Sequence, residues 1–234
     1  MTAAHPIEAK WPIQDRSKLQ FFSLNTPNGI KVAVALEELG LPYEPHLVRI
    51  GQDEQFTPEF KSISPNSKIP AILDFNGPGG KPLALMESGA ILIYLAEKAG
   101  RLLPSDPGRR YQCLQWLFFQ VGHIGPMFGQ FGHFFKYARE KCTDPYPIER
   151  YSNEAKRLLG VLDRQLSDRE FLVEEYSIAD IATFPWVRGL SASYQADEVL
   201  RVSDFEHVQA WLARCTARPA FQRGKDVTSS RPAG

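Results

Sequence analysis

The sequence of 234 residues lacks net charge and long apolar runs, and each absence excludes a class of function. Its 27 Lys and Arg residues balance 27 Asp and Glu residues, so no overall basic field attracts nucleic acid. No apolar run approaches the roughly 20 residues that cross a bilayer, and the N-terminus lacks the apolar core of a secretory signal. We expect a cytoplasmic protein with no nucleic-acid partner and no membrane partner.

Cysteine is also scarce, and its positions exclude two further kinds of site. Cys113, Cys142 and Cys215 are odd in number, widely spaced and outside any C-x-x-C pattern. This spacing predicts neither a disulfide framework nor a zinc site. We expect free thiols in a reducing compartment and no bound metal.

The length fits two modest domains or one elaborate domain. A stretch rich in proline, glycine and charge, "GRLLPSDPGRR" at 100–110, divides two parts of different pattern and indicates a boundary. We predict a first domain, a linker, a helical domain and loose terminal arms, over 18–100, 101–108, 109–225, and 1–17 with 226–234, respectively.

The first part alternates strand and helix signals. After the strand-like "LQFFSL", the segment "GIKVAVALEELG" allows two interpretations. Ile30, Val32, Val34 and Leu36 alternate as in a strand, but the alanines, the glutamates and the glycine stop at Gly40 favour a helix. We predict the helix.

The remaining segments complete a known pattern. A strand at 43–50 and a short helix in "TPEFKSISP" are followed by the strands "AILDF" and "KPLALM" and by a helix in "ESGAILIYLAEKAG". The order β-α-β-α-β-β-α over residues 19–100 predicts a thioredoxin-like α/β domain.

The second part reads almost entirely as helix and predicts an all-α bundle. Apolar residues mark one face of a long helix ending near Leu166, and "SIADIATFPWV" and "FEHVQAWLARC" have similar periods. Ser177 and Asp180 form a capping-box pattern, which we interpret as structural.

The turn "TPNG" at 26–29 joins the first strand to the first helix, where redox proteins of this shape usually carry a cysteine. Thr26 is a competent N-cap, and local chemistry alone favours this structural role. A helix N-terminus also stabilises an anion such as a thiolate. Because the turn has no cysteine, a ligand would bring the sulfur, and Thr26 and Asn28 could donate hydrogen bonds to it.

Two further segments carry both a structural and a functional interpretation. In "SKIP", Pro70 opens a strand; a cis bond would turn the Ile69 backbone toward a peptide-like ligand, whereas a trans bond would be ordinary. In "ESG", Ser88 is either a helix cap or, with Glu87, a receptor for an amino-acid head group. The residues alone do not decide between the structural and the functional interpretation of either segment.

These segments in order, "TPNG", "NSKIPAI", "ESGAILIYL" and "YSIADI", closely resemble a cytosolic glutathione S-transferase over residues 19–222. The strings "TPNGIK", "ISPNSKIPAI", "LQWLFFQ", "GPMFGQ" and "IERY" resemble the Nu-class or Ure2p-like branch, whose members bind glutathione and reduce disulfides. The resemblance implies a thioredoxin-like domain plus an all-helical domain, glutathione as cosubstrate and a homodimer.

The resemblance also implies roles for individual residues at the glutathione site. Thr26 and Asn28 would be the catalytic donors to the sulfur. Ile69 would pair its backbone with the cysteinyl part of glutathione, and Glu87 and Ser88 would bind the γ-glutamyl head.

More distant parts of the ligand involve further residues. By the same resemblance, Gln55 and Lys68 would reach the glycyl end, and Arg150 would contact a second glutathione or the mixed-disulfide substrate. Phe131 and His133 are candidates for a second-substrate cleft, although aromatic residues at helical spacing more often form core.

Three functions follow as hypotheses. The first is glutathione-dependent reduction of small or mixed disulfides. The second is conjugation of glutathione to an electrophile or reduction of an organic hydroperoxide, which is disfavoured because no tyrosine or serine stands at the turn. The third is a non-enzymatic regulator like Ure2p, but the N-terminal arm lacks an Asn/Gln-rich tract.

Overall fold

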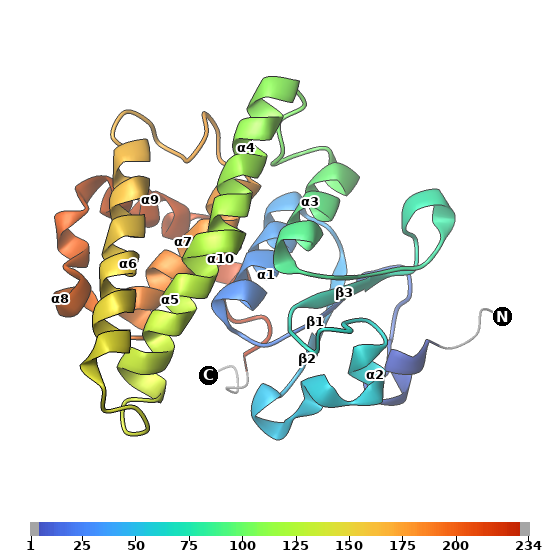
Figure 1. Ribbon diagram of the computed structural model, residues 1–234. Helices are drawn as coiled ribbons and strands as arrows, with labels where there is room; N and C mark the ends of the chain where they lie inside the picture. The colour runs from blue at the N-terminus through green and yellow to red at the C-terminus, as the bar shows by residue number, and fades with distance from the viewer. Residues whose placement is uncertain (1–4, 230–234) are drawn as a thin grey trace. The chain divides into compact units, whose positions relative to one another are not determined.

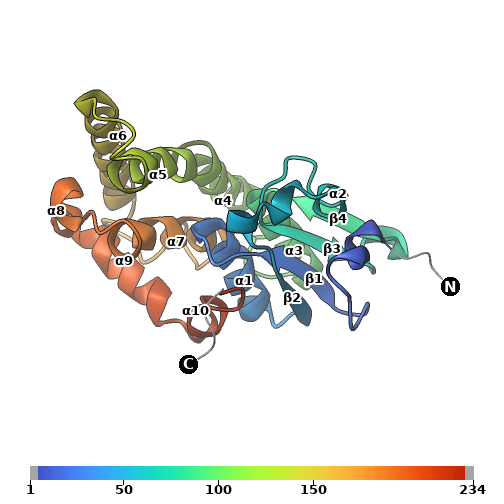
Figure 2. The same ribbon diagram turned by 90° about the horizontal axis from the view of Figure 1, so that it is seen from below.

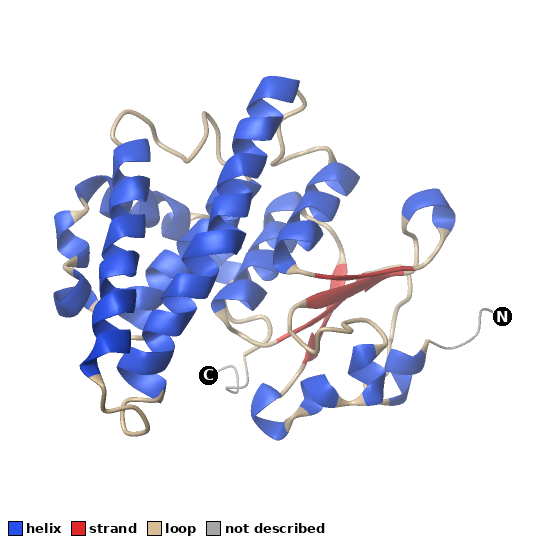
Figure 3. Ribbon diagram, in the orientation of Figure 1, coloured by secondary structure: helices blue, strands red, loops and turns tan. Residues whose placement is uncertain are grey.

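The computed structural model describes residues 5–229 and divides into two compact units. The first unit comprises the chain up to Gly100 together with the segment that follows Arg218, and the second spans Arg101–Arg218. Every strand of the described chain lies in the first unit, as Figure 3 shows. The thioredoxin-like and all-helical architectures predicted from the sequence are confirmed.

A four-stranded mixed sheet forms the middle of the first unit, in the order β2-β1-β3-β4 (Figure 2). The strands are β1 (Leu19–Ser23), β2 (Tyr43–Leu47), β3 (Ala71–Asp74) and β4 (Leu83–Met86). β1 pairs in parallel with β2 and antiparallel with β3, and β3 pairs antiparallel with β4. All five residues of β1 are buried, because this strand has a neighbour on each side and helices over both faces.

Helices α1 (Pro27–Leu39) and α3 (Ser88–Ala99) pack together on one face of the sheet (Figure 1). Helix α10 (Pro219–Gly224) packs against α1. Because neighbours surround it, α1 is buried over nearly its whole circumference, which explains why its sequence alternates like a strand without being one. Both α1 and α3 end at a glycine with positive φ, Gly40 and Gly100.

The opposite face of the sheet is covered by α2 (Pro58–Lys61) and by the N-terminal segment, which contains a short 3-10 helix (Pro6–Ala9). Ile7 and Trp11 are buried in a cluster with Phe22 and Phe60. The prediction of a loose arm over 1–17 is therefore wrong for residues 5–17. Two apolar side chains spaced four residues apart anchor this segment to the core.

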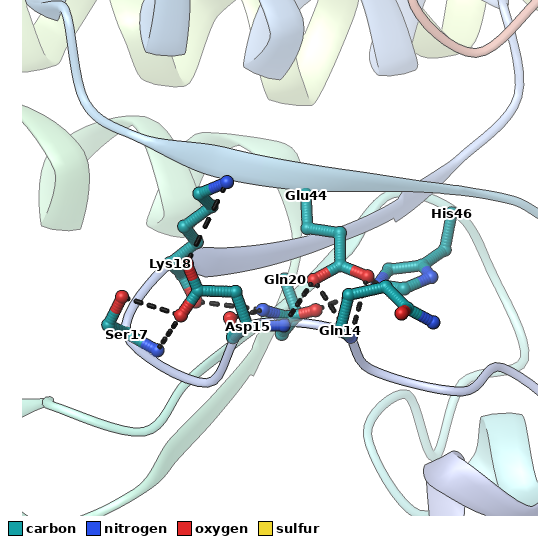
Figure 4. A network of polar contacts seen from close by, with 7 residues as sticks. All are labelled: Gln14, Asp15, Ser17, Lys18, Gln20, Glu44 and His46. Atoms are coloured by element: carbon teal, nitrogen blue, oxygen red, sulfur yellow. Dashed lines mark hydrogen bonds and ion pairs between the residues drawn. The ribbon is translucent and has the colours of Figure 1, made fainter.

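Polar contacts fix the rest of the N-terminal segment to the edge of the sheet (Figure 4). The Glu44 carboxylate on β2 accepts the backbone N–H groups of Gln14 and Asp15 at 2.9 and 3.0 Å. The Gln20 amide donates to the Asp15 carbonyl, and its oxygen lies 2.8 Å from Nε2 of His46. Gln20 pairs with Glu44 in the register, and both side chains lie on the sheet face that carries Phe22, so these contacts hold the segment against that face.

The second unit is a bundle of helices, and the helical segments predicted there are confirmed. Its helices are α4 (Pro107–Phe119), α5 (Gly125–Gly132), α6 (Pro145–Gln165), α7 (Ile178–Ala192), α8 (Asp197–Leu200) and α9 (Glu206–Ala217). Two π-helical turns, Gln120–Ile124 and His133–Tyr137, adjoin α5. None of the helices described is long and apolar enough to cross a bilayer.

The structure bears on the predictions made for the cysteines and for the end of the helical domain. Among residues 5–229, no disulfide joins Cys113, Cys142 or Cys215. The predicted helical domain ran to residue 225, whereas contacts group residues 219–224 with the first unit, because α10 returns to cover α1. A short helix near the end of the chain gives no local signal of where it docks.

Candidate functional site

The turn at the start of α1 is built around Thr26. Its hydroxyl oxygen accepts the Gly29 N–H at 3.3 Å, which confirms the predicted N-cap, and Pro27 occupies the first helical position. A hydroxyl that accepts a hydrogen bond retains its own O–H donor. The capping role and the proposed donation to sulfur therefore use different parts of the same group.

A pocket of about 230 Å³ lies in the first unit beside this turn. It is lined by Asn28, Ser64, Asn66, Lys68, Ile69, Pro70, Met86, Glu87 and Ser88. The structure thus brings together five of the residues that the sequence nominated, from three separate segments. Ser64, Asn66 and Met86 were not nominated, because nothing in their local pattern distinguishes them from ordinary loop and strand residues.

The segment before β3 supplies one wall of the pocket. The bond between Ile69 and Pro70 is cis, and the pairing of the Ile69 backbone with a ligand stays a prediction. The Ser64 hydroxyl donates to the Lys68 carbonyl at 2.8 Å and so holds the loop. The Lys68 side chain is exposed, whereas Ile69 is partly buried.

The start of α3 supplies another part of the lining. Glu87 is the N-cap residue, with φ +69°, and its side chain makes no capping hydrogen bond. Ser88 is the first helical residue and is buried, so the interpretation of Ser88 as the cap is wrong by one position. The exposed Glu87 carboxylate and the donors at the helix start can receive a ligand that carries both charges.

A buried lysine, Lys31, lies behind Ser88 and is not among the residues predicted from the sequence. Lys31 is 1% exposed, and its Nζ lies 3.3 Å from the Ser88 hydroxyl. Burial lowers the pKa of Lys31 to about 7, and the negative charge of Glu87 opposes this shift. The available signal was a single charged residue inside the apolar run from Ile30 to Leu36.

Other nominated residues lie apart from this pocket. Gln55 belongs to a short 3-10 helix (Glu54–Phe56), and its side-chain oxygen is buried without a hydrogen-bond partner. Phe131 is fully buried and stacks on Phe135 with ring centroids 5.0 Å apart. The prediction that Phe131 lines a substrate cleft is wrong, because its ring belongs to the core of the helical unit. His133 is exposed.

Arg150 lies in the second unit, at a separate hollow of about 570 Å³ on α5 and α6. The residues lining that hollow are Met127, Tyr146, Glu149, Arg150, Tyr151, Asn153, Glu154 and Arg157. Arg157 makes two hydrogen bonds to the Glu154 carboxylate, at 2.8 and 2.7 Å. Arg150 is exposed at this hollow.

The described residues provide no ligand set for a metal ion. Among residues 5–229, no group of three His, Cys, Asp or Glu side chains is placed to hold a metal ion. The pocket is bordered by the N-termini of α1 and α3 and by the exposed carboxylate of Glu87. That combination suits a small peptide with a free amino-acid end.

Comparisons with known proteins agree with this geometry. Residues 26–98 match the family model "Glutathione S-transferase, N-terminal domain", and residues 131–219 match "Glutathione S-transferase, C-terminal domain". The chain is 44% identical over 218 residues to the disulfide-bond oxidoreductase YghU of Escherichia coli strain K12, covering 89% of this chain and 74% of that protein.

Two crystal structures are also similar over almost the whole chain. A glutathione transferase from Burkholderia graminis, with two glutathione molecules bound per subunit, is 56% identical with a TM-score of 0.95, covering 100% of this chain and 97% of that one. One from Pseudomonas putida, with one glutathione disulfide bound per subunit, is 56% identical with a TM-score of 0.93, covering 98% of each chain.

Proposed function

Because the chain belongs to the glutathione S-transferase family, we propose that it is a glutathione-dependent disulfide-bond oxidoreductase. The observation that carries the proposal is a capped turn without a cysteine, bordering a pocket that suits a peptide with an amino-acid end. In this proposal the reactive sulfur belongs to bound glutathione.

Thr26 and Asn28 stabilise the glutathione thiolate. A free thiol has a pKa near 8.5, and lowering it by two units requires about 2.7 kcal/mol. The free O–H of Thr26, the Asn28 amide at the pocket and the N-terminus of α1 are donors of the kind that supply this energy.

The reaction is two thiol–disulfide exchanges. The bound thiolate attacks one sulfur of a small disulfide, forming a mixed disulfide with glutathione and releasing one thiolate. A second glutathione thiolate attacks the glutathione sulfur of the mixed disulfide, which yields glutathione disulfide and the second thiol. Two glutathione molecules are oxidised for each disulfide reduced.

The rest of the ligand is assigned to the pocket lining and to nominated residues outside it. The backbone of Ile69 pairs with the cysteinyl part, and Glu87 and Ser88 hold the γ-glutamyl head. The exposed ammonium of Lys68 and the amide of Gln55 face the glycyl carboxylate. Arg150 contacts the second glutathione or the mixed disulfide, and His133 contacts the second substrate.

Turnover of 2-hydroxyethyl disulfide with glutathione tests the proposal. Thr26→Ala and Asn28→Ala are each expected to lower kcat/KM by about 10- to 100-fold, the worth of one hydrogen bond to a charged group. Thr26→Ala also loses about 1 kcal/mol of stability with its cap, whereas Thr26→Ser keeps both hydroxyl functions and serves as the control.

A comparison of substrates separates disulfide reduction from glutathione conjugation and peroxide reduction. The highest kcat/KM is expected for the disulfide, ahead of 1-chloro-2,4-dinitrobenzene and cumene hydroperoxide. Faster conjugation or peroxide reduction, or unchanged disulfide turnover in both alanine variants, would show that the proposal is wrong. Absence of glutathione binding in calorimetry would instead favour a regulatory protein.

The proposal also includes a homodimer in the cytoplasm. Tyr111 and Phe118 on α4 are 73% and 64% exposed, and residues seven apart lie on one face of a helix, as a contact between copies requires. Reduction by glutathione needs a pool kept reduced, as in the cytosol. Light scattering on the wild type and on Phe118→Asp tests the dimer, which the charge is expected to weaken.

A further inference from the structure

Lys31 is a charged side chain enclosed in the interior of the first unit. It lies on α1, five residues after the cap Thr26, and is 1% exposed. Its Nζ reaches across to α3, where it lies 3.3 Å from the Ser88 hydroxyl, and this contact joins residues 57 positions apart. Lysine is almost never fully buried unless it has a partner, so its place here requires a reason.

Below pH 7 Lys31 is an ammonium, because its pKa is about 7, and an ammonium fixes the direction of this hydrogen bond. A protonated lysine has three N–H donors and no acceptor, so the Ser88 oxygen accepts. The Ser88 hydroxyl then keeps its own hydrogen for donation, and Ser88 lines the pocket. Lys31 thereby turns a group that can donate or accept into a donor toward a ligand.

Two neighbouring features make the same end of the pocket suit an amino-acid head. Ser88 begins α3, where backbone N–H groups have no partner within the helix. Glu87, one residue earlier, presents an exposed carboxylate. A ligand carboxylate meets the donors at Ser88 with the Lys31 charge behind them, while the ligand ammonium meets Glu87.

We propose that Lys31 is a positioning residue that acts through Ser88 and makes the pocket selective for thiols with a free α-amino-acid end, such as the γ-glutamyl group. This inference rests on the proposed function, since it assumes that the pocket binds glutathione. It adds to the proposed function that selectivity for the amino-acid end of the ligand depends on a buried cation that the ligand does not contact.

The test measures selectivity by calorimetry below pH 7, where Lys31 is protonated, as the ratio of dissociation constants for glutathione and cysteinylglycine, which lacks the γ-glutamyl group. The wild type is expected to prefer glutathione. Lys31→Met, which keeps most of the volume without the charge, is expected to reduce the preference about 10-fold, the usual effect of one charge-assisted hydrogen bond. Lys31→Arg, which keeps the donors, is expected to restore part of it.

Kinetics and a double-mutant cycle separate positioning from general stability. With saturating disulfide, Lys31→Met is expected to raise the KM for glutathione while kcat stays unchanged, because uniform binding is lost. Lys31→Met combined with Ser88→Ala is expected to be no less selective than Ser88→Ala alone. Lys98→Met, on the same unit but ion-paired with Asp74 away from the pocket, is the matched control.

The outcomes distinguish the two proposals. A wild type that binds glutathione no better than cysteinylglycine would overturn the proposed glutathione site itself. A wild type with the preference and a Lys31→Met variant with the same ratio would overturn only the role of Lys31. If Lys31→Met does not fold, Ser88→Ala decides, because it removes the hydroxyl through which Lys31 acts. An unchanged ratio in Ser88→Ala would overturn the role of Lys31.

Discussion

Gly29 determines how closely the start of α1 approaches the end of β1. A Cβ added at this position would lie 2.1 Å from the Leu24 carbonyl oxygen and 2.5 Å from the Ser23 hydroxyl. The Leu24 oxygen belongs to the backbone, so a change of rotamer cannot move it away. The turn that presents Thr26 therefore requires a glycine for space, and not only for turn propensity.

Gly29→Ala is expected to lose about 1 to 3 kcal/mol of stability, the usual cost of overpacking, and to lose glutathione binding while Thr26 and Asn28 remain. Denaturant unfolding and calorimetry measure the two effects. Gly51→Ala is the control, because a Cβ there meets nothing within 4 Å, and it is expected to change stability by less than about 0.5 kcal/mol. Equal stability and equal glutathione binding in the two variants would contradict the close approach of α1 to the end of β1.

The buried Lys31 gives the protein a specific dependence of stability on pH. Its pKa is about 7 in the folded state against an ordinary 10.5, so between these values the unfolded chain binds more protons. Stability therefore rises with pH from 7 upward, by about 2 kcal/mol from this group between pH 7 and pH 9, since one pKa unit is worth about 1.4 kcal/mol.

Unfolding of the wild type and of Lys31→Met at pH 7, 8 and 9 measures this contribution. The free energy of unfolding is expected to rise more steeply with pH in the wild type, because the methionine side chain of the variant does not titrate. The half-buried tyrosines Tyr43 and Tyr94 do not interfere, because partial burial raises their pKa values and both stay largely protonated in the folded and unfolded states over this range. Parallel pH profiles would show that Lys31 does not titrate there.

The start of α7 is held by one carboxylate, Asp180, which is completely buried. It accepts the backbone N–H groups of Leu172 and Ser177 at 2.9 and 3.0 Å and the indole N–H of Trp211 at 2.9 Å. The capping box predicted from the sequence is confirmed, and the structure adds a loop and helix α9 to what it fixes.

Asp180→Ala is expected to destabilise the protein by about 3 kcal/mol or more, because several buried donors lose a charged acceptor. The KM for glutathione in the folded protein is expected to stay unchanged, since Asp180 belongs to the helical unit. Thermal unfolding and disulfide turnover below the transition measure both. A raised KM with normal stability would contradict the structural role. Asp168→Ala, which removes an exposed carboxylate of the same unit, is the control.

Local signals explain which elements the sequence could predict. The cap at Thr26, the glycine stops at Gly40 and Gly100, and the capping box at Ser177 each act within a few residues, so the elements that they delimit agree with the structure. The pocket could be predicted in part for the same reason, because turns and helix starts supply most of its donors.

Contacts between distant segments explain what the sequence could not predict. Trp11 is anchored by residues of β1 and α2, and the Lys31 contact joins α1 to α3. Phe131 has the same spacing whether its helix face points inward or outward, so only packing decides its burial. None of these leaves a pattern within one window of sequence.

Considered as a whole, the chain leaves the first unit after Gly100 and returns to it at α10. Gly224 allows this return, because a Cβ there would lie 3.1 Å from the backbone of Ala33 and Val34 on α1. The following residues reach the turn at the start of α1: the Asn25 N–H donates to the Thr228 carbonyl at 3.1 Å, and Thr228 is buried.

Truncation after Gly224 is therefore expected to loosen the turn that carries Thr26 and to raise the KM for glutathione several-fold. It should also cost about 1 kcal/mol of stability for the lost hydrogen bond. Truncation after Ser229 retains the Thr228 carbonyl and is the matched control, with wild-type KM expected. If both truncated chains kept the wild-type KM in the disulfide assay, the end of the chain would merely cover α1. A raised KM in the shorter chain alone would mean that the geometry of the turn depends on residues near the opposite end of the sequence.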